Sequence, residues 1–396
     1  MQTLRFEGRG GEYFRIWIVN VMLTIITLSI YYPWAKVRTR RYFHGNTTLE
    51  GRSFDYHATG RQLLPGYLIS LLLLVIYIGV QTAFPVAALA LFGILVLAIP
   101  WIVWKSLGFN LRMTSFSTVR FGFAGTVGGA YVSYLAWPAL LLLGLLAGPF
   151  ITGILGNSGL LDSVTATLLT IAVMVAGYAL SFFLYAKVKQ RRTVYAIDGY
   201  RYGQGRFKTT VRTGGFARIL GKTIGLSLMM LLGVLALLAG LALVTGAAGD
   251  LLDLAGSLDD PEAVAEVLGT GAIVMLIAML YVGLLLLVFI LIAYGYTRQR
   301  AYILSHAALD KAITFASTLG ARRYAWVLLT NLLLVGVTLG LAIPWARVRL
   351  ARVLAEHTEV DTGAGFDDYM STRQEEQTSL GEQLGDAFDV DVGTGF

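Results

Sequence analysis

The chain has 396 residues, of which 56% are hydrophobic and only 14% charged, with a mean hydropathy of +0.68. A soluble protein of this length needs a more highly charged surface, so the composition favours an integral membrane protein. Cysteine is absent, which excludes disulfides, thiol catalysis and thiolate metal sites. The formal net charge is +7, yet residues 362–396 carry eight acidic residues against one arginine.

Eight apolar segments follow one another along the chain. A bilayer-spanning helix needs about 20 apolar residues, and each segment is long enough to supply one. The segments are Phe14–Trp34, Leu63–Gln81, Val86–Trp104, Ala130–Phe150, Val164–Ala186, Ile219–Thr245, Val267–Tyr296 and Ala325–Trp345.

Basic residues follow alternate segments. Lys and Arg in short loops face the cytoplasm in multi-pass proteins. This rule assigns residues 36–61, 105–120, 187–222 and 298–323 to the cytoplasmic side, and the 82–85, 156–163 and 246–266 turns to the outside. It predicts a multi-pass protein of the cytoplasmic membrane with anionic lipids as partners. The sequence does not predict an oligomeric state.

The first and last apolar segments repeat one another. Tyr13–Arg38 aligns with Tyr324–Arg349 without a gap, so that Asn20 meets Asn331 and a Pro-Trp-Ala-basic-Val-Arg motif recurs. A weaker unit also recurs, in which an aromatic residue follows a basic cluster after each helical region. We interpret these units as short cytoplasmic strands or hairpins.

The predicted fold is therefore an all-α polytopic membrane protein with short cytoplasmic β-hairpins and pseudo-symmetric internal repeats. We expect a single membrane domain over 1–361 with about five modules, followed by an acidic disordered tail over 362–396. The modules are 1–51, 52–119, 120–205, 206–311 and 312–361.

The outer apolar segments leave two topologies open. If both span, the chain has eight spans and the basic residues near 347 lie outside. If both re-enter as bent hairpins packed within protein, the chain has six spanning helices plus two re-entrant segments, and those residues stay cytoplasmic. The Asn, Thr and Pro residues in both segments favour re-entry.

Candidate site residues come from the repeated motif. Asn20 and Asn331 lie in mid-segment, where they either line a pathway or cap a helix break. Pro33-Trp34 and Pro344-Trp345 end their segments, which is typical of helix ends at a membrane interface.

The basic residues that follow determine topology, contact anionic lipids or form a site for a phosphate-bearing lipid or polymer. They are Lys36, Arg38, Arg40, Arg41, Arg347 and Arg349. Neither a nucleophile–base set nor metal-ligand spacing is present, so we predict no enzyme activity, cofactor or metal, and no nucleic-acid partner.

The first module resembles a known family. Ile18-Val19-Asn20, the run from Leu28 to Tyr42, Asn46-Thr47 and the run from Arg52 to Gly60 are similar to the signature of the YjgN-like family of bacterial inner-membrane proteins. The resemblance covers about residues 4–361 and leaves the acidic tail outside. It implies a location in the bacterial inner membrane and no established activity.

Two hypotheses on function follow. The first is transport or handling of a lipid or other envelope component, with the basic cytoplasmic rim as the functional surface. The alternative is a non-transporting membrane scaffold that binds a protein partner through its cytoplasmic strands and acidic tail.

Overall fold

The structure is a computed structural model that describes residues 1–157, 163–245, 249, 271–310, 312–363 and 368–376. It has two compact units: one comprises Met1–Ala217, Arg300–Leu319 and Leu334–Phe396, the other Arg218–Gln299 and Gly320–Leu333. The predicted outer loop at 246–266 and most of the 156–163 turn lie outside the described residues.

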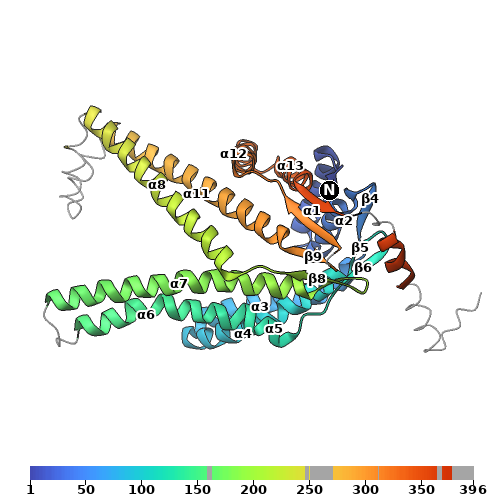
Figure 1. Ribbon diagram of the computed structural model, residues 1–396, viewed down its shortest axis with the longest axis horizontal. Helices are drawn as coiled ribbons and strands as arrows, with labels where there is room; N and C mark the ends of the chain where they lie inside the picture. Colours follow the sequence, from blue (N-terminus) through green and yellow to red (C-terminus); the bar gives the residue numbers. More distant parts are fainter. Residues whose placement is uncertain (158–162, 246–248, 250–270, 311, 364–367, 377–396) are drawn as a thin grey trace, which may run out of the picture. The chain divides into compact units, whose positions relative to one another are not determined.

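Most of the described chain is helical, and six helices are long and apolar enough to cross a membrane. They coincide with the six middle apolar segments, so the predicted helical membrane protein is confirmed. At most 11% of each apolar window is buried inside the protein. The helices are α3 Gly60–Ala83, α4 Pro85–Arg112, α5 Val127–Tyr131 continued by η1 Val132–Ala136 and α6 Trp137–Asn157, α7 Ser163–Gly199, α8 Thr213–Thr245 and α11 Gly271–Ser305. Figure 1 shows α6 and α7 side by side.

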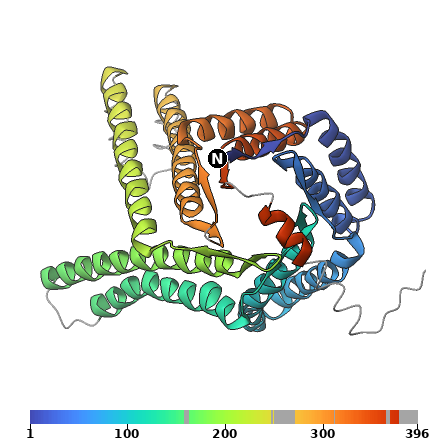
Figure 2. The ribbon, with the colours of Figure 1, turned by 45° about the vertical axis from the view of Figure 1, so that its right-hand side comes forward.

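The outer apolar segments each form a broken pair of shorter helices. At the N-terminal end, α1 (Gly10–Ile26) is followed by α2 (Tyr32–Gly45), which packs against it (Figure 2). Near the other end, α12 (Ala321–Val337) is followed by α13 (Ile343–Glu356). The second helix of each pair carries the basic cluster, so the helical structure extends beyond the predicted apolar segment.

Both breaks have the same backbone geometry. A leucine adopts a left-handed conformation just after the first helix, with φ 47° at Leu28 and 48° at Leu339. The next amide then bonds back to a carbonyl five residues earlier, over 2.7 Å from Ser29 and 2.8 Å from Gly340. This is the Schellman arrangement, which satisfies carbonyl groups that a helix end would otherwise leave unpaired.

A threonine completes each break. The Thr27 hydroxyl donates to the Leu23 carbonyl and accepts the Tyr31 amide over 3.0 Å. In the second copy, Thr338 accepts the Ala342 amide over 3.0 Å. The chain therefore turns between two helices with its backbone polar groups paired, which is what a turn in an apolar environment requires.

Eleven short strands join into one antiparallel sheet, which lies within the first unit. They are β1 Gln2–Thr3, β2 Arg5–Phe6, β3 Thr47–Leu49, β4 Arg52–Tyr56, β5 Thr114–Phe116, β6 Val119–Phe123, β7 Tyr200–Tyr202, β8 Gly205–Thr209, β9 Ala307–Leu309, β10 Ile313–Ser317 and β11 Thr358–Asp361.

The N-terminal segment closes this sheet into a ring. β1 pairs with β11 at one end of the strand order, and β2 pairs with β3 at the other end. A single residue, Leu4, separates β1 from β2 in the chain. The Leu4 amide between them donates to the Thr358 carbonyl over 3.0 Å. We call this closed sheet the strand ring.

The core of the first unit lies inside the strand ring. Phe54, Phe121, Phe207 and Phe315 occupy the middle of alternate strands, and with Leu4, between β1 and β2, they line an apolar cavity of about 240 Å³. Each of the four phenylalanines pairs across strands with another apolar residue, as Phe54 does with Phe116 and Phe121 with Tyr202. The ring interior is thus apolar, with these side chains packed around the cavity.

Every helical pair leaves the strand ring and returns to it. α1 begins four residues after β2 ends and α2 ends just before β3 begins; α12 and α13 stand in the same relation to β10 and β11. Within the predicted disordered tail, residues 368–376 form a helix, and the other residues beyond 363 lie outside the described part.

Candidate anion-binding site between α2 and α3

The start of α2 is held by its Pro-Trp pair. Pro33 lies near the helix start, where its missing amide hydrogen costs nothing, and it is fully buried. Trp34 follows and stacks on the Tyr31 ring, with centroids 6.1 Å apart and planes 11° from parallel. The motif therefore fixes two aromatic rings at the entrance to α2.

Trp34 also packs on the first residue of α3, which must be glycine. A Cβ atom added at Gly60 would lie 2.4 Å from two carbons of the Trp34 indole, far inside contact distance. The absence of a side chain at Gly60 thus lets α3 begin against α2. This contact sets the distance between the start of α2 and the start of α3.

Three arginines meet in the pocket that this packing creates. The pocket has a volume of about 400 Å³ and is lined by Tyr31, Trp34, Val37, Arg38, Arg41, Thr59, Gly60 and Arg61. Arg38 and Arg41 lie three residues apart on α2, so they share one face of the helix. Arg61 comes from the first turn of α3.

The pocket's positive charge is not neutralised by the described residues. Arg38 donates to two neutral acceptors, the Asn20 side-chain oxygen over 3.4 Å and the Tyr31 hydroxyl over 3.2 Å. Arg41 donates to the backbone carbonyls of Tyr56 and Ala58. Arg61 lies at a helix start, where the helix dipole adds further positive potential. The arrangement favours an anion, and guanidinium groups match the oxygen geometry of phosphate.

The other basic residues of the first motif lie elsewhere. Arg40 donates to the Tyr56 hydroxyl over 2.7 Å and to the Asn110 side-chain oxygen, and its guanidinium lies over the Tyr56 ring. It therefore joins α2 to β4 and α4. Lys36 is exposed on α2 and does not line the pocket.

Asn20 supports the pocket from α1. Its side chain is 5% exposed; it donates to the Ala35 carbonyl on α2 and accepts from Arg38, each over 3.4 Å. Asn20 thus bridges α1 and α2, and the break itself is closed by Thr27 and the backbone. Asn331 lies at the equivalent place on α12 and is 8% exposed.

The second copy of the motif repeats the packing with fewer charges. Pro344 is fully buried, and Trp345 lies over Gly10 as Trp34 lies over Gly60. Arg352 donates to the Gly8 carbonyl over 3.0 Å, which matches the Arg41 contact with Ala58.

Two other arginines of this copy lie on α13. Arg347 donates to the Tyr13 hydroxyl over 3.2 Å, and Arg349 occupies the position of Arg38. However, Ala342 stands where the first copy has Tyr31, and Gly11 stands where it has Arg61. The second copy therefore lacks one aromatic ring and one cation of the pocket.

Arg61 is absent from the residues predicted from the sequence, although it completes the pocket. One feature of the sequence could have pointed to Arg61. It is a basic residue in the first turn of a helix, where the helix dipole disfavours cations, and that turn has no acidic residue. An unfavourable charge at such a position indicates a compensating anion. Nothing in the sequence shows that α3 begins beside Arg38.

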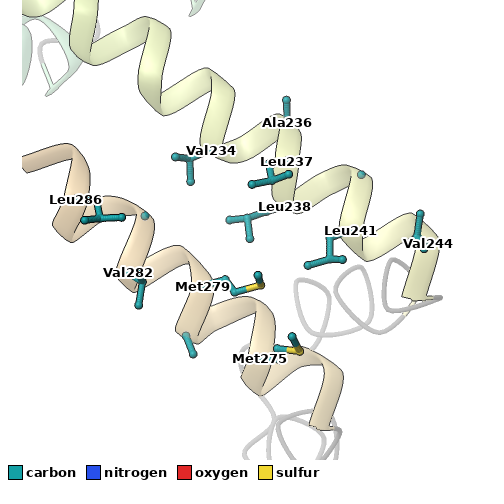
Figure 3. A pocket seen from close by; sticks show the side chains of 13 residues that line it. Val234, Ala236, Leu237, Leu238, Leu241, Val244, Met275, Met279, Val282 and Leu286 are labelled. Carbon is teal, nitrogen blue, oxygen red and sulfur yellow. The ribbon is translucent and has the colours of Figure 1, made fainter. Parts of the chain in front are cut away.

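A larger cavity in the second unit is lined by apolar side chains and glycine. It has a volume of about 820 Å³ and separates α8 from α11 (Figure 3), with Leu237, Leu241, Met275 and Met279 among its lining residues. Side chains of this kind face hydrocarbon in a bilayer, so lipid chains would fill the space. We therefore place the candidate site at the arginine pocket.

Comparison with known proteins gives the family. The family model described as "Bacterial protein of unknown function (DUF898)" matches residues 1–387. The inner membrane protein YjgN of Salmonella typhimurium is 31% identical over 363 residues, which cover 90% of this chain and 88% of that protein. The YjgN protein of Escherichia coli O157:H7 is 31% identical over 170 residues, or 43% of each chain. No solved structure matches the chain.

The family model spans nearly the whole chain, the Salmonella relative covers most of it, and six helices are able to cross a membrane. The chain therefore belongs to the DUF898 family of bacterial proteins, together with the YjgN proteins, and is a multi-pass protein of the inner membrane.

Proposed function

We propose that the protein binds the phosphate group of an anionic membrane component between α2 and α3, as part of the transport or handling of a lipid or other envelope component. The observation that carries this proposal is the convergence of Arg38, Arg41 and Arg61 on one pocket beside Trp34. Tryptophan and arginine together suit the headgroup region, where aromatic rings meet the membrane surface and cations meet phosphate.

The position of the pocket relative to the bilayer rests on a second proposal, that α1–α2 and α12–α13 re-enter the membrane without crossing it. Their tips expose large apolar side chains that only hydrocarbon would cover: Leu28 is 85% exposed and Leu339 94%. α2 and α13 have 14 residues each, fewer than a full span needs, and α1 has 17, at the lower limit. Re-entry would place both basic clusters on the cytoplasmic side.

Binding of a short-chain phosphatidic acid to the purified protein in nanodiscs tests the proposed function. Arg61→Gln should weaken binding by roughly tenfold or more, because a hydrogen bond to a charged group contributes about 1.5–3 kcal/mol. Arg38→Gln should act in the same direction. Arg112→Gln is the matched control, since it removes the same charge from an exposed helix end outside the pocket.

The ligands distinguish the sources of the phosphate. A short-chain diacylglycerol should bind much more weakly than the phosphatidic acid. Inorganic phosphate that binds as tightly as the lipid would identify a free phosphate as the ligand. Equal binding of the phosphatidic acid and the diacylglycerol, or an Arg61→Gln variant with unchanged affinity, would contradict the proposal.

The scaffold alternative has less support. A partner strand needs an unpaired sheet edge, and the end strands of the described sheet, β1 and β2, have only two residues each. The described part of the acidic tail is also engaged with this chain's own strand ring, since Arg373 pairs with Asp310. A partner would first have to displace that contact.

A further inference from the structure

The mouth of the strand ring is covered by a segment from the far end of the chain. Residues 368–376, the short red helix in Figure 2, follow the last strand, β11, and lie against the ring. Met370 is 2% exposed and lines the apolar cavity together with Leu309 and Ile313 of the ring. Its sulfur accepts a hydrogen bond from the Tyr202 hydroxyl over 3.3 Å. Met370 is thus inserted into the ring interior.

Polar contacts hold the helix on the tips of two hairpins, β5–β6 and β9–β10, which flank the β7–β8 hairpin in the sheet. Arg373 pairs with Asp310, at the β9–β10 turn, over 2.9 Å. The Gln374 side chain donates to the Ser117 carbonyl, at the β5–β6 turn, over 2.7 Å. Both turn residues have positive φ, 49° at Asp310 and 47° at Ser117, so the tight turns themselves present these acceptors.

Asp310 is the centre of this docking surface. Its carboxylate also accepts the Tyr369 hydroxyl over 2.8 Å and the backbone amide of Arg206 over 2.9 Å. Burial, and then the hydrogen bond to Asp310, raise the pKa of Tyr369 to about 12, so its hydroxyl remains a donor at physiological pH. One carboxylate therefore ties the helix to the ring through two side chains.

Beneath the helix, the apolar interior continues through the ring. A second cavity, of about 400 Å³, is lined by Leu4, Phe54 and Phe121, which also line the cavity under Met370. It reaches Phe43 on α2 and Leu111 on α4. The central side chains of the strands thus separate two apolar spaces, and Met370 covers one of them.

We infer that the mouth of the strand ring is a docking surface for an amphipathic helix, and that residues 368–376 are a displaceable plug bound to it in cis. A nine-residue helix is too short to be stable alone in water, so it forms only while docked. The docked contact is one buried methionine and a few polar bonds. Its release uncovers the apolar cavity of the ring.

Cysteine accessibility tests the plug, because the natural chain has no cysteine. In full-length protein in nanodiscs, Met370→Cys should react with a maleimide at least tenfold more slowly than Ser371→Cys, which is exposed on the same helix. Adding Arg373→Ala should bring the Met370→Cys rate towards that of Ser371→Cys. Equal rates at 370 and 371 in the otherwise unchanged chain would overturn the inference.

A reporter on the ring makes the test independent of substitution at Met370. The native Ile313 is 4% exposed and lines the cavity, so Ile313→Cys places a thiol inside the ring. Deletion of residues 364–396 should raise its labelling rate at least tenfold, whereas Glu375→Gln, on the exposed side of the helix, should leave it unchanged. An unchanged rate after the deletion would mean that the ring closes without the plug.

Discussion

At the scale of single residues, the Pro-Trp motif acts mainly through packing. Pro33 begins α2, and Trp34 occupies the space that a side chain at residue 60 would fill. The motif then leaves Arg38 and Arg41 one and two helical turns further on, facing Arg61. The tryptophan thus positions the arginines of the candidate site, because it sets where α3 begins.

Gly60→Ala should destabilise the protein by about 1–3 kcal/mol, because its Cβ atom would overlap the Trp34 indole. The apparent melting temperature of the purified protein measures this effect. Gly66→Ala is the matched control on the same helix: a Cβ atom there meets nothing within 4 Å, so that variant should be as stable or more stable. Equal melting temperatures for the two variants would contradict the packing role.

At the scale of elements, the two broken helical pairs share the same backbone arrangement at the break. Each ends its first helix with a left-handed leucine and uses a threonine hydroxyl to accept the amide four residues further on. An unpaired amide in an apolar environment is costly, so the threonine matters most if the break lies in hydrocarbon.

Thr27→Val should lower the unfolding free energy by about 1–3 kcal/mol, because it preserves shape but leaves the Tyr31 amide without its acceptor. Thr338→Val should act alike through the Ala342 amide. Thr24→Val serves as the control, since that hydroxyl donates to the Asn20 carbonyl inside α1, before the break. Chemical unfolding in detergent measures the unfolding free energy of all three variants. If the Thr24 variant were as unstable as the Thr27 variant, the loss would not be specific to the helix break.

At the scale of the whole molecule, the strand ring joins the two ends of the chain. β1 pairs with β11 across more than 350 residues of sequence, and every helical pair starts and ends at a strand of the ring. If the ring lies on the cytoplasmic side, all its connections lie there too, including the end of α13.

Single-cysteine labelling in cells checks this sidedness without background. Glu356→Cys, at the end of α13, should react only after the membrane is permeabilised, whereas Thr82→Cys, at the predicted outer turn after α3, should react in intact cells. Labelling of residue 356 from outside would show that α12–α13 crosses the membrane and that the re-entrant arrangement is wrong.

The sequence by itself determined the six long helices, and it predicted that the chain's two ends repeat one another. Both depend on local patterns, since an apolar run of about 20 residues or a Pro-Trp-Ala-basic motif is visible without knowledge of the fold. The aromatic residue of each recurring unit, such as Phe54, was also visible, but a strand of three to five residues carries no information about its partner.

Only the tertiary structure decided how those strands pair, where the tail goes and which arginines meet. Closure of the ring depends on contacts between β1 and β11, and the plug on contacts between Met370 and Tyr202. Arg61 joins Arg38 because α3 packs on Trp34 through a glycine. Such contacts join residues distant in sequence, and their energy depends on packing and charge in space, which no local pattern records.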